Sequence, residues 1–129
     1  MNNIEQEIQA KGLTAPRVTP ADIATNILAE HYFTAEHGVL GYERKVLLQG
    51  AEPDFGNPDH WGGPDLSPLR LLTFCVLVLR NGFTVTGESA CASPENFDAE
   101  IGRKIARENA LQKIWPLMGY ELKQRLSQE

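Results

Sequence analysis

The chain has 129 residues, of which 42% are hydrophobic and 22% charged, and its formal net charge is −5. This composition fits one globular domain with a real core and excludes a disordered chain. No apolar run reaches the ~18 residues that a membrane span needs, and the polar start lacks the layout of a secretion signal. Because Cys75 and Cys91 also fit a reducing compartment, we expect a cytosolic protein.

The charge is divided unevenly along the chain. Residues 1–101 carry six basic and fourteen acidic side chains, whereas residues 102–129 carry six basic and three acidic ones. An acidic body repels long nucleic acid, whose binding depends on many phosphate contacts. A local basic patch can still hold a compact anion. The sequence therefore favours a small anionic ligand and predicts neither nucleic-acid nor membrane binding.

The N-terminal part predicts a flexible arm over 1–18, followed by one domain over 19–129. Ile4, Ile8 and Leu13 fit a short helix within the arm, which Pro16 would end.

A second helix is predicted over 20–31. Thr19 can cap this helix, Pro20 suits its first position, and Ile23 and Ile27 mark one apolar face. His31 would then lie near the helix C-terminus, where a positive charge is favourable.

Residues 31–49 predict one or two short strands, and residues 50–68 a long loop. The loop has four glycines and four prolines, is acidic, and carries Phe55 and Trp61. A loop of this length within a compact domain is usually functional or mobile.

The clearest structural signal is a β-hairpin over 71–88. Residues 71–79 are almost wholly apolar, which predicts a strand buried on both faces, either as a central strand or beneath a subunit partner. Asn81-Gly82 is a strong signal for a two-residue turn before the alternating FTVTGES.

A helix follows over about 98–115. Asn96 and Asp98 are candidate caps, Ser93 can cap a short turn before them, and Pro116 should end or kink the helix. The residues placed on its core side are Ile101, Gly102, Ile105, Ala106, Ala110 and Leu117, and those placed on the opposite side are Arg103, Lys104 and Arg107.

No catalytic or metal site is predicted. The segment GESAC around Ser89 is not a Gly-x-Ser-x-Gly nucleophile elbow, and Cys91 fits a small buried residue. The three histidines match no metal-ligand spacing. We therefore expect no catalytic residues, no metal and no cofactor.

The segment 87–107 is the candidate ligand site. A small-residue turn before a helix N-terminus favours an anion, and Arg103 and Arg107, one turn apart, could reach the same phosphate. Phe83 and Phe97 could supply an aromatic surface for a base. The competing interpretation is a solvated basic face, with Phe97 packed into the core.

Asn109 lies on the side assigned to the core. A buried asparagine needs hydrogen-bond partners, so we expect it to tie the helix to the hairpin or a turn, or to make a subunit contact.

The segment LLTFCVLVLRNGFTVTGESACASPENFDAEIGRKIARENALQKIWPLMGYEL resembles a family of small uncharacterised tailed-phage accessory proteins, as does EHYFTAEHGV before it. The resemblance covers roughly residues 20–122. The pattern NGF, S-A-C, P-x-N-F-D and I-G-x-x-x-A-R-E-N-A is also similar to the first-described Thoeris anti-defence proteins.

That second resemblance implies a sponge in the host bacterial cytoplasm. Such proteins sequester cyclic ADP-ribose isomers, and in some relatives cyclic oligonucleotides, without cleaving them, at sites between subunits of a homo-oligomer. It implies ligand-binding roles for Phe83, Asn96, Arg103 and Arg107.

The expected fold is α+β: a small antiparallel sheet with a central hairpin, packed against one long helix and one shorter N-terminal helix. The expected function is sequestration of a cyclic nucleotide by a homo-oligomer. The alternatives are a phage module that binds a host protein through its acidic glycine-rich loop, and a small nucleotide hydrolase.

Overall fold

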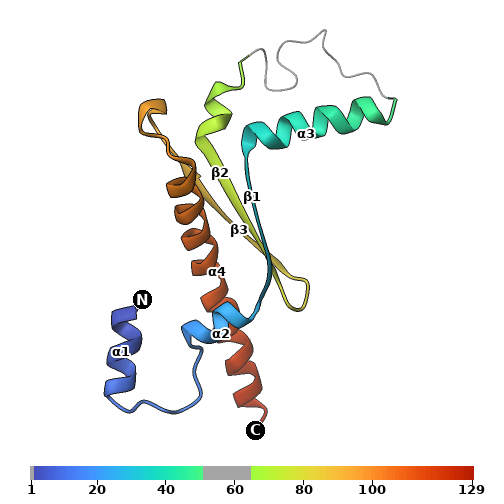
Figure 1. Cartoon of the computed structure of the whole chain (residues 1–129). Helices are drawn as coiled ribbons and strands as arrows, with labels where there is room; N and C mark the ends of the chain where they lie inside the picture. The colour runs from blue at the N-terminus through green and yellow to red at the C-terminus, as the bar shows by residue number, and fades with distance from the viewer. Residues whose placement is uncertain (1, 51–64) are drawn as a thin grey trace.

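The computed structural model describes residues 2–50 and 65–129, and in them it shows a sheet with a long helix across it (Figure 1). The strands β1 (Ile27–Thr34), β2 (Leu72–Leu79) and β3 (Thr84–Ala90) are antiparallel in the order β1-β2-β3. The helix α4 (Ala99–Ser127) packs on β3 and β2. The predicted α+β class is confirmed.

The predicted hairpin is confirmed, but its turn differs from the prediction. The Leu79 N–H donates to the carbonyl of Phe83 at 2.8 Å, so three residues, 80–82, form the turn rather than two. Gly82 has a φ of +89°, a left-handed conformation that is characteristic of the last residue in a three-residue hairpin loop. The strand β2 is central, which is one of the two predicted placements, but only its alternate residues are buried, so within one chain the expected burial on both faces was wrong.

The core forms where α4 lies directly on the sheet. Alternate residues of β2 are buried beneath the helix, and they are Thr73, Cys75, Leu77 and Leu79. The other buried residues of the core are Ile23, Val85, and Ala106, Ala110 and Ile114 of α4 itself. At Gly87 of β3 the two backbones meet: a Cβ there would lie 2.1 Å from the Ala106 carbonyl oxygen and 2.3 Å from the Ala110 nitrogen. Only a glycine permits this approach.

The small side chains therefore decide which side of α4 is buried. Its buried residues are Gly102, Ala106, Ala110 and Ile114, spaced four apart. The larger Ile101, Ile105 and Leu117, which were expected in the core, are 56%, 46% and 41% exposed. That part of the prediction was wrong because the hydrophobicity of a side chain does not indicate how closely a helix approaches a sheet.

The helix α4 also runs past Pro116 to Ser127, beyond the predicted end. Pro116 lies on an exposed part of the helix, where the carbonyl that loses its helical N–H partner can be solvated. The predicted cap Asp98 is confirmed, since its side chain accepts from the Ile101 N–H at 3.0 Å. Ser93 precedes the short 3-10 helix η2 (Pro94–Asn96) without a side-chain capping bond.

The predicted helix over 20–31 was wrong in its second half. Helix α2 (Pro20–Thr25) begins with the expected Thr19 cap but stops at Asn26, and Ile27–Thr34 forms β1. Asn26 accepts the Arg80 N–H at 3.0 Å, which turns the chain toward the hairpin. Pairing with the apolar β2 outweighs local helix propensity here. His31 therefore lies on a strand, opposite Val76, and not at a helix end.

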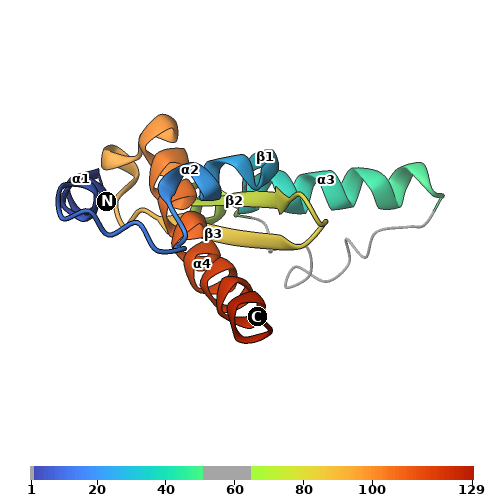
Figure 2. The ribbon, with the colours of Figure 1, turned by 90° about the horizontal axis from the view of Figure 1, so that it is seen from below.

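The strands expected over 31–49 are only partly present, because residues 35–48 form helix α3 (Ala35–Leu48). Thr34 caps this helix: its Oγ1 accepts from the His37 N–H at 3.2 Å, while His37 Nδ1 accepts from the Thr34 N–H at 3.1 Å. The reciprocal pair is a capping box in which histidine replaces the usual glutamate or glutamine. Figures 1 and 2 show α3 extending away from the sheet.

The predicted loop over 50–68 is described only at its ends. Residues 51–64, including Phe55 and Trp61, lie outside the described residues, and the short 3-10 helix η1 (Ser67–Leu71) follows.

The arm contains the expected short helix, α1 (Asn2–Ala10). Arg17 donates two hydrogen bonds to the Glu5 carboxylate, at 2.8 and 2.6 Å, and these fold the arm back on itself. Figure 2 shows α1 at the opposite end of the molecule from α3.

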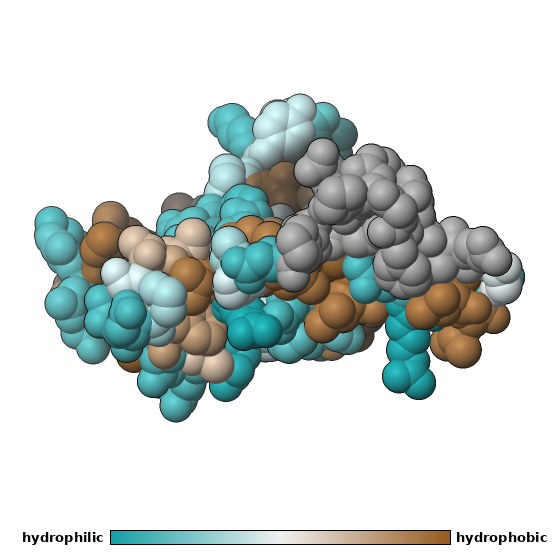
Figure 3. Space-filling view, turned by 90° about the horizontal axis from the view of Figure 1, so that it is seen from above, coloured by the Kyte–Doolittle hydropathy of each residue, from teal (hydrophilic) through white to brown (hydrophobic). Residues whose placement is uncertain are grey.

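The sheet face opposite α4 is the less covered one. The residues of β2 on that face are only half-buried, and they are Leu72, Phe74, Val76 and Val78. Phe33 of β1 lies beside Phe74, with ring centroids 5.6 Å apart. Exposed hydrophobic side chains continue onto α3, at Leu40, Tyr42, Leu47 and Leu48, and Figure 3 shows hydrophobic groups at that end of the molecule.

The contact at Gly87 predicts a strong effect of a single methyl group. Gly87→Ala should destabilise the fold by more than about 3 kcal/mol, since the new Cβ would overlap two backbone atoms of α4. Thermal unfolding followed by circular dichroism measures this change.

The matched control is Gly119→Ala in helix α4, where a Cβ would meet nothing within 4 Å. It should stabilise the protein by about 0.5–1 kcal/mol. Equal melting temperatures for the two variants would contradict the proposed packing.

Candidate functional site

A groove lies where the starts of α3 and α4 approach the end of β1. It encloses about 330 Å³, within the range of small-ligand pockets. We call it the α3–α4 groove, and its lining residues are Tyr32, Phe33, Thr34, Glu36, His37, Arg70, Thr73, Phe97, Ala99 and Arg103. The aromatic residues Tyr32 and Phe97 and two guanidinium groups thus share one hollow, whereas the Phe33 ring lies beside Phe74 on the other face of the sheet.

Arg103 is the cation available in this groove. It lies on the second turn of α4 and makes no hydrogen bond or ion pair with the residues that the structure describes. The second guanidinium, of Arg70, is paired with the Glu36 carboxylate. The carboxylate offsets one of the two positive charges, so the groove retains a net positive charge from Arg103.

His37 adds a ring N–H donor to the groove lining. Its Nδ1 accepts the Thr34 N–H, so the ring donates through Nε2. The capping box holds the ring in this orientation. His37 and Arg70 thus line the same groove.

The floor of the groove is formed by Thr73 beneath the first turn of α4. Thr73 is 3% exposed, and its Oγ1 has no hydrogen-bond partner among the described residues. A Cβ on Gly102 would lie 3.1 Å from this oxygen and 3.7 Å from the Phe97 ring. Glycine at 102 therefore lets α4 lie close against the buried hydroxyl.

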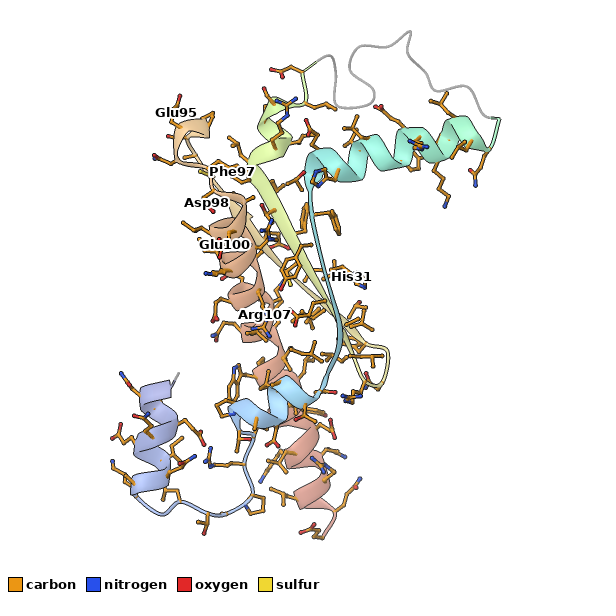
Figure 4. All side chains as sticks on the ribbon, viewed as in Figure 1. His31, Glu95, Phe97, Asp98, Glu100 and Arg107 are labelled. Atoms are coloured by element: carbon orange, nitrogen blue, oxygen red, sulfur yellow. The ribbon has the colours of Figure 1, made fainter. Side chains whose placement is uncertain are left out.

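Arg107, one turn after Arg103, is engaged with β1. Its Nε donates to Glu30 Oε1 at 2.8 Å, and the Tyr32 hydroxyl donates to the same oxygen at 2.7 Å. Figure 4 shows Arg107 on the side of α4 that faces β1. The guanidinium of Arg107, and then the Tyr32 hydroxyl, lower the pKa of Glu30. Burial, followed by the hydrogen bond to Glu30, raises the pKa of Tyr32, which stays protonated as a donor.

The structure therefore separates the two predicted arginines. Arg103 lines the α3–α4 groove, whereas Arg107 lines a smaller hollow of about 170 Å³ between α2 and α4, with Ile23 and Trp115. Both lie on one side of the helix, but each lines a different hollow.

The other two predicted residues lie at opposite ends of β3. Phe83 is 56% exposed at the hairpin tip, before the strand, and Asn96 is exposed in η2, after it. Seven strand residues span roughly 20 Å, so one chain does not bring them together. Phe97 follows Asn96 and is half-buried in the groove (Figure 4).

Comparison with known proteins identifies the family. A family model described as the phage protein (N4 Gp49/phage Sf6 gene 66) family matches residues 18–126. The chain belongs to this phage protein family. The match contains the sheet, α3 and nearly all of α4, and it leaves α1 outside. No curated protein and no solved structure matches the chain.

The sequence of this phage protein did not predict that Arg70, His37 and Thr73 line the groove. All three lie outside the segment 87–107, on elements that pairing with β2 brings to the start of α4. The signal available for His37 was Thr34 three residues before it, at capping-box spacing. Nothing local to Thr73 distinguishes it from the other residues of an apolar strand.

Asn109 performs the predicted tie to the hairpin. Its Nδ2 donates to the Glu88 carbonyl of β3 at 2.8 Å. The residue is exposed, however, so its expected burial was wrong.

The two cysteines are not among the residues that line the groove. Burial raises the pKa of the Cys75 thiol, and the Cys91 thiol donates to the Ser93 carbonyl at 3.2 Å. Within residues 2–50 and 65–129, no group of three histidine, cysteine or acidic side chains is arranged to hold a metal. No helix in the same ranges combines the length and the apolar character of a membrane span.

The pair formed by Glu30 and Arg107 predicts a pH-dependent stability. The lowered pKa means that Glu30 stabilises the fold above its ordinary value of about 4.5, and that this contribution disappears as the pH falls through the folded value. Glu30→Gln should lower the unfolding free energy by less than about 1 kcal/mol at pH 7, since both side chains are about one-third exposed. The difference should shrink as the pH falls below about 4.5.

Denaturant unfolding at pH 7, 5 and 3 measures this difference. Glu100→Gln is the matched control, because its pair with Lys104 is about 70% exposed and should contribute little at any pH. A Glu30→Gln effect that is the same at pH 7 and pH 3 would show that the ion pair is not its cause.

Proposed function

We propose that this phage protein captures cyclic nucleotide immune signals of its bacterial host, cyclic ADP-ribose isomers or cyclic oligonucleotides, and holds them intact in the host cytoplasm. The observation that carries the proposal is the α3–α4 groove, which combines aromatic side chains with Arg103, a cation that has no partner within residues 2–50 and 65–129. A phosphate favours a guanidinium, and a purine favours an aromatic surface. The resemblance of the pattern over residues 81–110 to the Thoeris anti-defence proteins supports the same assignment.

The side chains around the groove support the proposal that the ligand is released intact. A sponge needs no nucleophile or general base, only donors, charge and enclosure. Within the described residues, neither Ser89 nor Cys91 is hydrogen-bonded to a histidine. His37 uses Nδ1 to cap α3, which leaves that nitrogen unavailable as a base. We therefore assign the protein no catalytic activity.

The site is proposed to be completed by a second copy. Phe83 lies at the hairpin tip, away from the groove, and Arg107 is paired with Glu30. Within one chain, neither residue is therefore proposed to bind the same ligand as Arg103. The half-buried apolar residues of β2 and Phe33 offer a surface for a neighbouring subunit. In a homo-oligomer, Phe83 or Asn96 of one copy can approach Arg103 of another.

An alternative is a module that binds a host protein. The observation in its favour is α3, which has no buried residue and exposes Leu40, Tyr42, Leu47 and Leu48. The acidic loop that would contribute to such a contact lies mostly outside the described residues. A small nucleotide hydrolase is the third possibility.

One experiment separates these functions. The protein is mixed with cyclic ADP-ribose isomers or cyclic trinucleotides, freed of unbound ligand, heated, and the released compound is analysed by mass spectrometry. Intact ligand supports capture, a cleaved product indicates a hydrolase, and no retention favours the interaction module. Arg103→Ala should reduce retention at least about tenfold, by loss of a charge-assisted bond, and Arg107→Ala should also reduce it.

Lys113→Ala is the matched control, since it removes one positive charge from the same helix outside the groove. It should retain ligand like the unmodified protein. Because Arg107→Ala also leaves Glu30 without its ion pair, Arg103→Ala is the decisive variant. Normal retention by both arginine variants would show that the site lies elsewhere.

The homo-oligomer has its own test. Sedimentation equilibrium should give a mass above that of one 14.3 kDa chain, and Val76→Glu should reduce it by placing a charge on the half-buried sheet face. Gln112→Glu, on the exposed side of α4, is the control. A single-chain mass for the unmodified protein at micromolar concentration would refute the shared site.

A further inference from the structure

The Thr73 hydroxyl is the only buried side-chain polar atom without a partner within residues 2–50 and 65–129. A buried hydroxyl without a hydrogen bond is destabilising, and most such groups in folded proteins are satisfied. Thr73 also lines the α3–α4 groove, so its unused hydrogen-bonding capacity lies at the groove floor. An isosteric valine would fit a β-strand equally well, so the fold alone gives no reason for the hydroxyl.

Two neighbours control access to this hydroxyl. Gly102 has no side chain where a Cβ would lie 3.1 Å from Thr73 Oγ1, and the Phe97 ring borders the same space at 3.7 Å. The oxygen itself is closed to water. Phe97 follows a short 3-10 helix, outside any longer element, so its ring can turn aside without disturbing the sheet or α4.

We propose that Thr73 is the specificity-determining residue of the groove, and that its hydroxyl binds a ribose hydroxyl of the captured nucleotide when Phe97 turns aside. This inference rests on the proposed function. The ligand group is neutral because Thr73 Oγ1 is buried near the Phe97 ring and Gly102, and burying a phosphate charge beside them would be unfavourable. The phosphate is bound instead at Arg103.

This arrangement divides recognition between two parts of one groove. Arg103 provides charge attraction that any phosphate-bearing ligand satisfies. A buried hydroxyl discriminates more sharply, since a ligand without the matching group leaves the protein hydroxyl unpaired. The groove should therefore distinguish a ribose from a deoxyribose ligand with the same phosphates and bases.

The test compares a cyclic trinucleotide built from ribonucleotides with its 2′-deoxy counterpart, by calorimetry on the full chain. The unmodified protein should bind the ribose form about tenfold more tightly, the effect of one hydrogen bond. Thr73→Val should lose this preference while its melting temperature stays equal or rises, because the variant removes an unpaired buried polar group. Thr73→Ser should keep the preference, since it keeps the hydroxyl.

The outcomes are distinct. If the unmodified protein binds neither compound, the proposed function fails for this ligand class and the inference fails with it. If it binds both and Thr73→Val keeps the same preference, only the inference is overturned. A lower melting temperature of Thr73→Val with unchanged binding would assign the hydroxyl a structural role and overturn the inference as well.

Discussion

The structure depends on one close contact between backbones. Gly87 of β3 lies against Ala106 and Ala110 of α4, at a distance that leaves no room for a side chain. This contact fixes both the height and the rotation of the helix on the sheet. The same rotation turns Gly102 toward Thr73 and leaves Arg103 at the α3–α4 groove. The position of the candidate site is therefore a consequence of small side chains in the core.

The two arginines of α4 have different electrostatic surroundings. Arg107 is paired with Glu30, and this pair, with the Tyr32 hydroxyl, joins β1 to the helix. Arg103 lies one turn nearer the helix N-terminus and has no acidic partner among the described residues. In a chain with a net charge of −5, an unpaired guanidinium beside aromatic groups is a locally positive site in an acidic molecule. Such a site favours a small anion over a long polyanion.

The sequence predicted the elements whose signals are local. The hairpin followed from an apolar run and Asn81-Gly82, and the start of α4 followed from Asp98. It predicted a strand only for the second half of β1 and a helix for the first half, because residues 27–30 join the strand through pairing with β2. It did not predict α3, since a histidine at the end of a capping box is an unusual signal.

The candidate site was predicted only in part, for a related reason. Arg103 and Phe97 lie in the segment that the sequence singled out, and both line the groove. Arg70, His37 and Thr73 come from elsewhere in the chain and meet there through sheet pairing. On α4, the expected burial of Gly102, Ala106 and Ala110 is confirmed. Ile101 and Ile105 were wrongly placed with them, because the sheet selects the smaller residues.

The central claim is that the α3–α4 groove binds a phosphate-bearing nucleotide. A titration of ¹⁵N-labelled protein with a cyclic ADP-ribose isomer, followed by backbone amide chemical shifts, tests it most directly. The account predicts that the largest changes occur at Thr73, Phe97 and Arg103, with smaller ones at the start of α3. Changes confined to the exposed outer side of α3, or no changes at ligand concentrations well above that of the protein, would contradict it.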